Sequence, residues 1–294
     1  MKNLISHLLF PLTFGAGLFI ALVGLDEGVS GDVLVAAISV GTFVVVAAFE
    51  RILPEHPDWN IAQGDVQTDL LHGLVSMVML PQILQVAMRL GLLHVAVQLA
   101  EFLGGGVWPV AWPLWAQLVL ALIISQFFEY WAHRLLHEIP LLWRFHATHH
   151  SPRRLYWLNA GRFHPVDSAL LHVVGMGPLM LLGAGAEVMA LYTIWVAMHG
   201  TFQHCNIRVR LGALNYVFSM AELHRWHHSL KLDEANANYG NNILLWDLVF
   251  GTVHYPRDAQ ASSEIGLSDN PDFPGDYLGQ VLSPFRWKEK RSGK

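Results

Sequence analysis

Residues 8–25 read LLFPLTFGAGLFIALVGL, a run that contains no Asp, Glu, Lys or Arg. Several such runs approach the ~17–25 residues that a helix needs to cross a bilayer. The chain is 53% hydrophobic and 14% charged, whereas soluble domains carry about a quarter charged residues. The sequence therefore predicts an all-α fold, a polytopic membrane helical bundle. The further uncharged runs are 33–49, 113–128, 168–186 and 188–207.

The first run is expected to remain in the protein as a span. It is too long for the apolar part of a signal peptide, and no A-x-A site precedes Asp26. A further apolar stretch, 70–88, contains Pro81, which a membrane helix tolerates as a kink.

The basic residues indicate an orientation. If the N-terminus lies in the cytoplasm, 17 of the 18 Lys and Arg residues fall on the cytoplasmic side, with Arg89 as the exception. This agrees with the positive-inside rule, and Trp108, Trp112 and Trp115 lie around the opposite turn as an interfacial aromatic belt would. We expect a multi-pass protein of the cytoplasmic (inner) membrane. Its cytoplasmic segments would be 50–65, 132–167 and the chain after about 207.

Histidines gather in three short motifs, all on the side predicted to be cytoplasmic. These are HRLLH at 133–137, HATHH at 146–150 and HRWHH at 224–228. Residues at positions i, i+3 and i+4 share one face of a helix, so each motif presents its imidazoles together. The eight histidines are His133, His137, His146, His149, His150, His224, His227 and His228.

Such clusters favour a metal site over a polar patch at the lipid headgroups. Packed neutral imidazoles would need many hydrogen-bond partners, and protonated imidazoles would repel one another. A metal ion removes both difficulties, because each ligating ring donates a lone pair and stays uncharged. Eight histidines exceed the roughly four to six positions around one ion, so two ions are expected. HGTFQHC offers a further ligand, His204 at the predicted membrane boundary or His199 about one turn deeper.

Several known metal sites are excluded. Arg134 occupies the place of the glutamate of HExxH, so the metalloprotease motif is absent. The lone Cys205 excludes Cys-rich zinc sites and iron–sulfur clusters in this chain. The Glu-x-x-His pairs of carboxylate-bridged di-iron bundles are not found either. A site made almost wholly of imidazole suits iron, zinc, copper or nickel.

The order of motifs over about residues 120–255 resembles the fatty acid hydroxylase / sterol desaturase superfamily of membrane di-iron oxygenases. The segments that carry the resemblance are HRLLHEIPLLWRFHATHHS, GRFHPVD, HGTFQHCN, HRWHHS and NYGNNILLWDLVFGT. The N-terminal part, with ERILPEHPDWN and TDLLHG, looks like bacterial sterol desaturase family proteins. The resemblance implies an N-terminal transmembrane region (1–112), a catalytic domain (113–255) whose histidine-rich helices form a cytoplasmic cap, and a cytoplasmic tail (256–294).

The resemblance also implies the site and its chemistry. Two iron ions with O₂ as co-substrate would hydroxylate or desaturate a C–H bond of a lipid. Electrons would come from a separate donor, either ferredoxin or cytochrome with a reductase, or a pterin, and no nucleic-acid partner is expected. The implied ligands are His133, His137, His146, His149, His150, His204, His224, His227 and His228, while the gap of four residues between His199 and His204 leaves open which of those two binds metal.

Further polar residues are candidates for a ligand or a partner of a ligand, each with a structural alternative. His164 could instead be a loop residue, Asp69 and His72 could belong to a helix N-cap, and Glu129 and Glu222 could face lipid headgroups. Asn238 is expected to connect the last segment to the metal-binding helices.

Two other functions remain as alternatives to an oxygenase. A membrane zinc-dependent hydrolase would use bound hydroxide as its nucleophile and would need neither O₂ nor reductant. A metal transporter would line a path across the bilayer with histidines, whereas here the motifs lie on one side.

Overall fold

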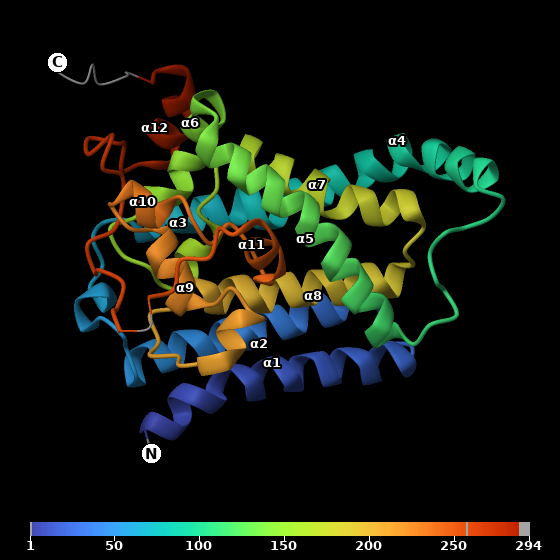
Figure 1. Cartoon of the computed structure of the whole chain (residues 1–294), viewed down its shortest axis with the longest axis horizontal. Coiled ribbons are helices and arrows are strands. Elements are labelled where there is room, and N and C mark those ends of the chain that lie inside the picture. The colour runs from blue at the N-terminus through green and yellow to red at the C-terminus, as the bar shows by residue number, and fades with distance from the viewer. Residues whose placement is uncertain (1, 257, 288–294) are drawn as a thin grey trace.

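The computed structural model describes residues 2–256 and 258–287, and the regular structure in these residues is helical (Figure 1). The prediction of an all-α membrane bundle is confirmed. The long helices are α1 (Lys2–Asp26), α2 (Gly31–Ile52), α4 (Leu80–Phe102), α5 (Leu114–Glu138), α7 (Pro165–Leu182) and α8 (Ala186–Gln203).

Five stretches are long and apolar enough to cross a membrane. Four of them are α1, α2, α5 and α7, and the fifth runs from Val66 to Phe102 without a break. This last stretch joins α3 (Val66–His72), the π-helical η2 (Gly73–Met79) and α4. Pro81 lies inside this continuous stretch, directly after the π-helical η2, and it removes one backbone donor from the helix interior.

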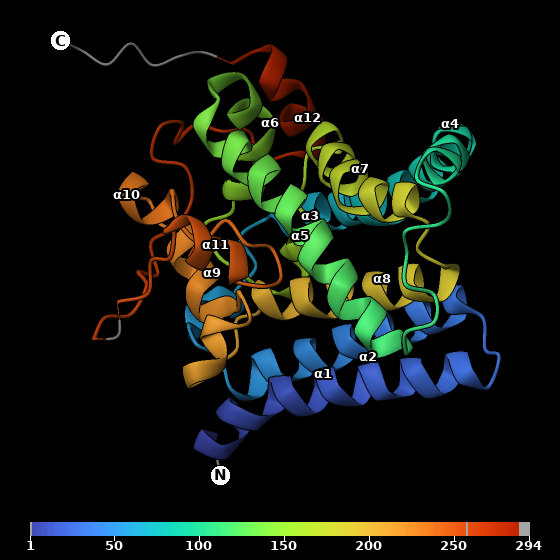
Figure 2. The same ribbon diagram turned by 45° about the vertical axis from the view of Figure 1, so that its right-hand side comes forward.

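Helix α8 lies inside the bundle and contacts α1, α2 and α5 (Figure 2). Most of its large side chains are buried, including Leu191, Ile194 and Met198. Gly17 of α1 lies directly against Met198, so the absence of a side chain there lets the two helices approach closely. A helix enclosed on most sides needs apolar residues around its circumference, as this sequence has.

Helices α4, α5 and α7 form a second layer, in which α7 contacts both others. At its centre Glu129 of α5 is buried and accepts hydrogen bonds from Tyr192 (2.6 Å), Gln126 (2.7 Å) and Asn241 (3.1 Å). Gly175 of α7 faces this carboxylate, and any side chain there would overlap it. The buried carboxyl group thus has the hydrogen-bond partners that a buried polar group needs.

The short helices lie at one end of the bundle and form what we call the cap, residues 139–164, 204–256 and 258–287 (Figure 1). The opposite end carries the connections after α1, α4 and α7. The cap helices are α6 (Pro140–His150), η3 (Trp157–Gly161), η4 (Gly212–Tyr216), α9 (Ala221–His227), α10 (Leu232–Ala235), α11 (Leu245–Phe250), α12 (Tyr277–Leu282) and η5 (Ser283–Phe285), with η1 (Pro57–Asn60) beside them.

Candidate metal centre

Four helices bring nine histidines together where the cap meets the bundle. They are the last turns of α5 and α8 and the short helices α6 and α9. Pro140 begins α6 directly after α5, which turns the chain so that HATHH lies against HRLLH.

The nine histidines form two groups, and in each group the candidate ligand atoms lie within 4.8 Å of one another. The groups adjoin, because the rings of His150 and His228 stack across them with centroids 4.3 Å apart. The five-histidine group is His133, His137, His146, His150 and His227, and the four-histidine group is His149, His204, His224 and His228.

Each three-histidine motif is divided between the groups. In HATHH the i, i+4 pair His146 and His150 belongs to the five-histidine group, and His149 belongs to the other. In HRWHH the pair His224 and His228 joins the four-histidine group, and His227 crosses to the five-histidine group. The spacing i, i+4 therefore directs two rings to one centre, and the histidine between them directs the third ring to the neighbouring centre.

Most of these rings are oriented through Nδ1. In the five-histidine group His133 donates to Tyr239 O (2.7 Å), His227 to Ala237 O (2.8 Å) and His146 to Asp167 Oδ2 (2.8 Å). Partners of this kind fix the tautomer and leave Nε2 free for a metal. Further partners are Asn236 Oδ1 for His137, Arg162 O for His149 and Asn159 Oδ1 for His204.

The contacts between rings fit a cation. The Nε2 atoms of His133 and His227 are 3.1 Å apart, although both Nδ1 atoms face carbonyl oxygens that can only accept. Both Nδ1 atoms must therefore carry the proton, and two Nε2 lone pairs face each other. Protonation of one ring would restore a hydrogen bond, but burial holds the pKa of His227 well below its usual value. A shared metal ion satisfies both lone pairs.

Unpartnered ring nitrogens support the same fit. His137 Nε2, His150 Nε2, His224 Nδ1 and His228 Nδ1 are buried without a hydrogen-bond partner. Buried polar atoms in native proteins normally have partners, so several unpaired lone pairs at one place indicate a site for a metal ion. Burial also lowers the pKa of His149 and His224 well below the usual value, which keeps these rings in the neutral form that binds metal.

His199 lies outside both groups. Its ring is buried among Phe10, Phe14 and Phe218, and neither ring nitrogen has a hydrogen-bond partner. His204 instead contacts His224 with Nε2 atoms 2.9 Å apart. Of the two histidines that the spacing left open, the structure brings only His204 to the centre.

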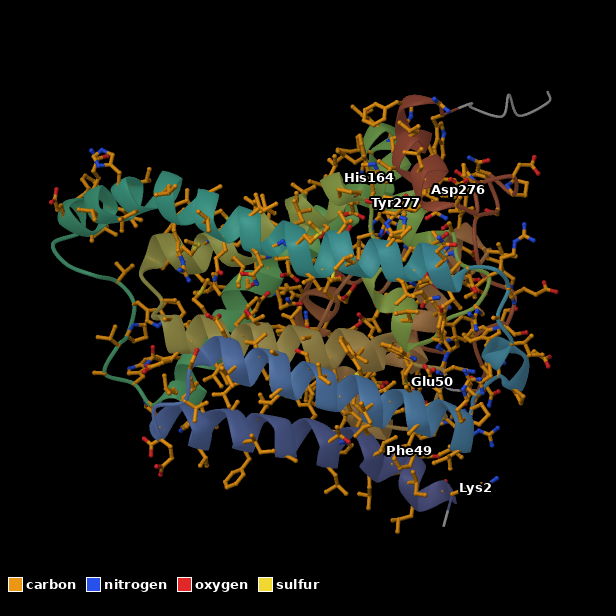
Figure 3. All side chains as sticks on the ribbon, turned by 180° about the vertical axis from the view of Figure 1, so that it is seen from behind. Lys2, Phe49, Glu50, His164, Asp276 and Tyr277 are labelled. Atoms are coloured by element: carbon orange, nitrogen blue, oxygen red, sulfur yellow. The ribbon has the colours of Figure 1, made fainter. Side chains whose placement is uncertain are left out.

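His164 and His72 also lie outside the two groups, and both contact the segment around α12. His164 caps α7 by accepting from the Val166 N–H, and its Nε2 lies 3.1 Å from Val281 O (Figure 3). The ring of His72 lies between Phe163 O and Gln280 Oε1, at 2.9 Å from each. Neither His72 nor His164 belongs to a group of candidate metal ligands.

The carboxylates suggested as partners of ligands do not contact a ligating ring. Asp69 pairs with Arg162 (2.5 Å) and accepts from Tyr156 (2.7 Å), and it is not a helix N-cap, because Asp65 precedes α3. Glu129 belongs to the network inside the bundle. Glu222 accepts from Leu211 N (2.9 Å) and Asn215 Nδ2 (2.7 Å). Asn238 has the connecting role that was expected, because it donates to Leu223 O and His254 O.

The sequence reasoning missed the side chains that do orient the rings. Asp167 is fully buried against His146, and Asn159 and Asn236 contact His204 and His137. Asp167 lies in the RFHPVD segment, only three residues after His164, so a carboxylate close to a candidate histidine was the available signal.

The fold and the site together define a multi-pass membrane protein with two adjoining all-histidine centres at one end of its bundle. The family model of fatty acid hydroxylase matches residues 118–252. Ornithine lipid hydroxylase OlsE of Rhizobium tropici is 36% identical over 98% of this chain and 86% of the relative.

More distant relatives match about half of this chain. Alkylglycerol monooxygenase of Danio rerio is 29% identical over 49% of this chain and 31% of its own length. Methylsterol monooxygenase 2-2 of Arabidopsis thaliana is 28% identical over 51% of this chain and 57% of its own length. No solved structure matches.

The chain belongs to the fatty acid hydroxylase family. It is therefore an oxidoreductase among membrane enzymes that hydroxylate lipids with O₂, as the resemblance implied. The hydrolase and transporter alternatives find no support among these relatives.

Proposed function

We propose that this protein is a di-iron lipid hydroxylase whose two irons are held by the five-histidine and four-histidine groups. The observation that carries the proposal is the convergence of nine imidazoles, eight of them buried, into two adjoining sets, in each of which the candidate ligand atoms lie within 4.8 Å of one another. Imidazole ligands suit iron, and oxygenase relatives favour it over zinc.

The overall reaction would be R–H + O₂ + 2e⁻ + 2H⁺ → R–OH + H₂O. The chemistry that the metals supply is reductive activation of O₂ for insertion of oxygen into a C–H bond. The chain itself holds the rings neutral, fixes their tautomers through the Nδ1 acceptors and excludes water by burying the centre. The apolar helices would present the lipid from the bilayer.

The first substrate class to test is an acylated amino-acid lipid such as an ornithine lipid. The relative named for that lipid matches almost the whole chain, whereas the alkylglycerol monooxygenase relative matches about half of it. The described residues contain no iron–sulfur ligand set, so a separate donor, either a ferredoxin or cytochrome with its reductase or a pterin, would supply the electrons.

We also propose that the cap faces the cytoplasm across an inner membrane, on the basis of the distribution of Lys and Arg. Residues 1–112 would form the N-terminal transmembrane region, 113–255 the catalytic domain and 256–294 the tail.

Metal content tests this proposal. Detergent-purified protein from iron-replete cells should carry about two irons per chain, measured by elemental analysis, since about four ligands serve each ion. His149→Ala and His227→Ala remove ligands from different groups, so each should lose one ion and the double variant both. No metal in folded wild-type protein would contradict the proposal, and stable zinc with activity independent of O₂ and reductant would favour the hydrolase.

A further inference from the structure

Residues 236–240, here called the acceptor segment, lie beside the five-histidine group without supplying a ligand to it. Three of the five rings nevertheless form hydrogen bonds to this segment through Nδ1. They are His133 at Tyr239 O (2.7 Å), His227 at Ala237 O (2.8 Å) and His137 at Asn236 Oδ1 (3.2 Å).

We propose that the acceptor segment is a positioning element for the five-histidine group alone, and that Asp247 is the residue that holds it in shape. The inference rests on the proposed metal centre and adds to it a separate structural support for one of the two ions.

The peptide planes carry the argument. In a trans peptide the C=O and the N–H of one unit point in opposite directions. The unit that supplies Tyr239 O to His133 has the N–H of Gly240 on its other side, and this N–H donates to Asp247 Oδ2 (2.7 Å). The carboxylate therefore fixes the plane whose carbonyl receives the ligand.

The second carbonyl is held in the same way. Ala237 O belongs to the peptide unit of the Asn238 N–H, which donates to Thr252 O (2.9 Å). Thr252 in turn donates its hydroxyl to Asp247 Oδ1 (2.7 Å) and its backbone N–H to the backbone carbonyl of Asp247 (2.9 Å). Both carbonyls thus depend on contacts that converge on Asp247, which is fully buried and also accepts from Tyr239 N (2.8 Å).

Asn238 makes the required bend possible. Its φ of 54° is the one positive value among the described residues other than glycine, and asparagine tolerates this left-handed conformation. Its side chain donates to Leu223 O and His254 O and accepts from His254 N, which holds the bend against α9. The two flanking carbonyls consequently reach rings of the same group.

Among the described residues, no hydrogen bond or ring contact joins the four-histidine group to this segment. Its oriented rings, His149 and His204, use Arg162 O and Asn159 Oδ1 instead. Loss of the Asp247 carboxylate should therefore weaken the binding of one ion and leave the binding of the other unchanged. A general loss of packing would weaken the binding of both ions.

The test is metal stoichiometry in Asp247→Asn, measured on full-length protein in detergent after dialysis against a chelator. The amide would turn one acceptor into a donor facing a backbone N–H, so retention should fall from two ions to one. Adding His204→Ala should remove the second ion, while adding His133→Ala should cause no further loss. Asp276→Asn is the matched control, because that side chain caps α12 and should keep two ions.

The inference would be overturned if Asp247→Asn kept two ions as firmly as wild type during dialysis against the chelator. It would also be overturned if the variant lost metal equally from both groups while eluting and unfolding like wild type. If Asp247→Asn does not fold, Asn236→Ala replaces it. This variant removes only the acceptor of His137 and should weaken retention of one ion by roughly tenfold, and unchanged retention would be decisive against the segment. A wild-type protein without metal would instead contradict the proposed function itself.

Discussion

Asp167 shows how a single side chain can serve the centre without binding metal. Its Oδ2 accepts from His146 Nδ1 at 2.8 Å, and it is fully buried. Partners of this kind typically contribute about 10–100-fold in metal affinity. We expect Asp167→Ala to lower the affinity for one ion by that factor, measured by competition with a chromogenic chelator. Asp167→Asn keeps an acceptor oxygen and should lose less metal affinity. Equal affinities in wild type, Asp167→Ala and Asp167→Asn would contradict this role.

For His199, in contrast, we expect a substitution to leave metal binding unchanged. Its ring contacts phenylalanine side chains, and His199 belongs to neither histidine group. His199→Phe should therefore keep the full metal content. His204→Ala should lose one ion, because His204 lies in the four-histidine group. Elemental analysis of the two variants side by side checks this, and an ion lost from His199→Phe would place that residue among the ligands after all.

At the scale of the element, the contact of α5 with α7 depends on a glycine. A Cβ at Gly175 would overlap Glu129 Oε1, and several donors hold that carboxylate in place. Gly175→Ala should therefore destabilise the bundle by about 1–3 kcal/mol, the usual cost of overpacking. Thermal unfolding in detergent measures this. Gly177→Ala is the control, because its Cβ would meet Met88 Cε only at 3.7 Å and should leave the midpoint nearly unchanged.

The elements themselves were largely predictable, and their mutual placement was not. Uncharged runs such as 8–25 and 33–49 became α1 and α2, because in an apolar environment a helix satisfies its own backbone. The run 188–207, expected to pair with the run before it as a hairpin or a re-entrant pair, became α8, which packs against α1, α2 and α5 and is not apolar enough over its length to count among the five candidate spans. Hydropathy records that a segment is apolar and does not record whether lipid or protein surrounds it.

At the scale of the whole molecule, the stability of the metal-free protein should depend on pH through its buried imidazoles. Burial lowers their pKa values, while unfolded histidines titrate near 6.5. The unfolded state thus binds more protons below that pH, so this stability is present above about pH 6.5 and is lost as the pH falls. The rings outside the spans with such a shift include His146, His149, His150, His224, His227 and His228.

Metal-free protein should accordingly unfold at a lower temperature at pH 5 than at pH 7.5, as measured in detergent after chelation. Asp247 opposes the trend, because burial raises its pKa to about 6 and its contribution is lost as the pH rises through that value. Outside the spans, the effect of this one carboxyl group is outweighed by that of the several imidazoles. A midpoint that rises on acidification would contradict this account.

The arrangement of the chain also predicts its topology. Lys2 and Asp276 both lie at the cap end of the bundle (Figure 3). Reporter tags placed before α1 and after η5 should therefore have the same accessibility in sealed, inverted membrane vesicles, tested by proteolysis. Tags protected on one terminus only would contradict the arrangement of helices.

The sequence by itself determined the class of fold, the presence of eight clustered histidines and the chemistry that they suit. These follow from local properties: hydropathy over about twenty residues and spacing within one or two helical turns. Only the tertiary structure decided which ring joins which centre, since His149 and His150 are neighbours in sequence and lie in different groups. It also decided that Asp167 and the carbonyls of the acceptor segment orient those rings. Backbone carbonyls are present at every residue, so no sequence pattern distinguishes the few that meet a histidine when distant segments pack together.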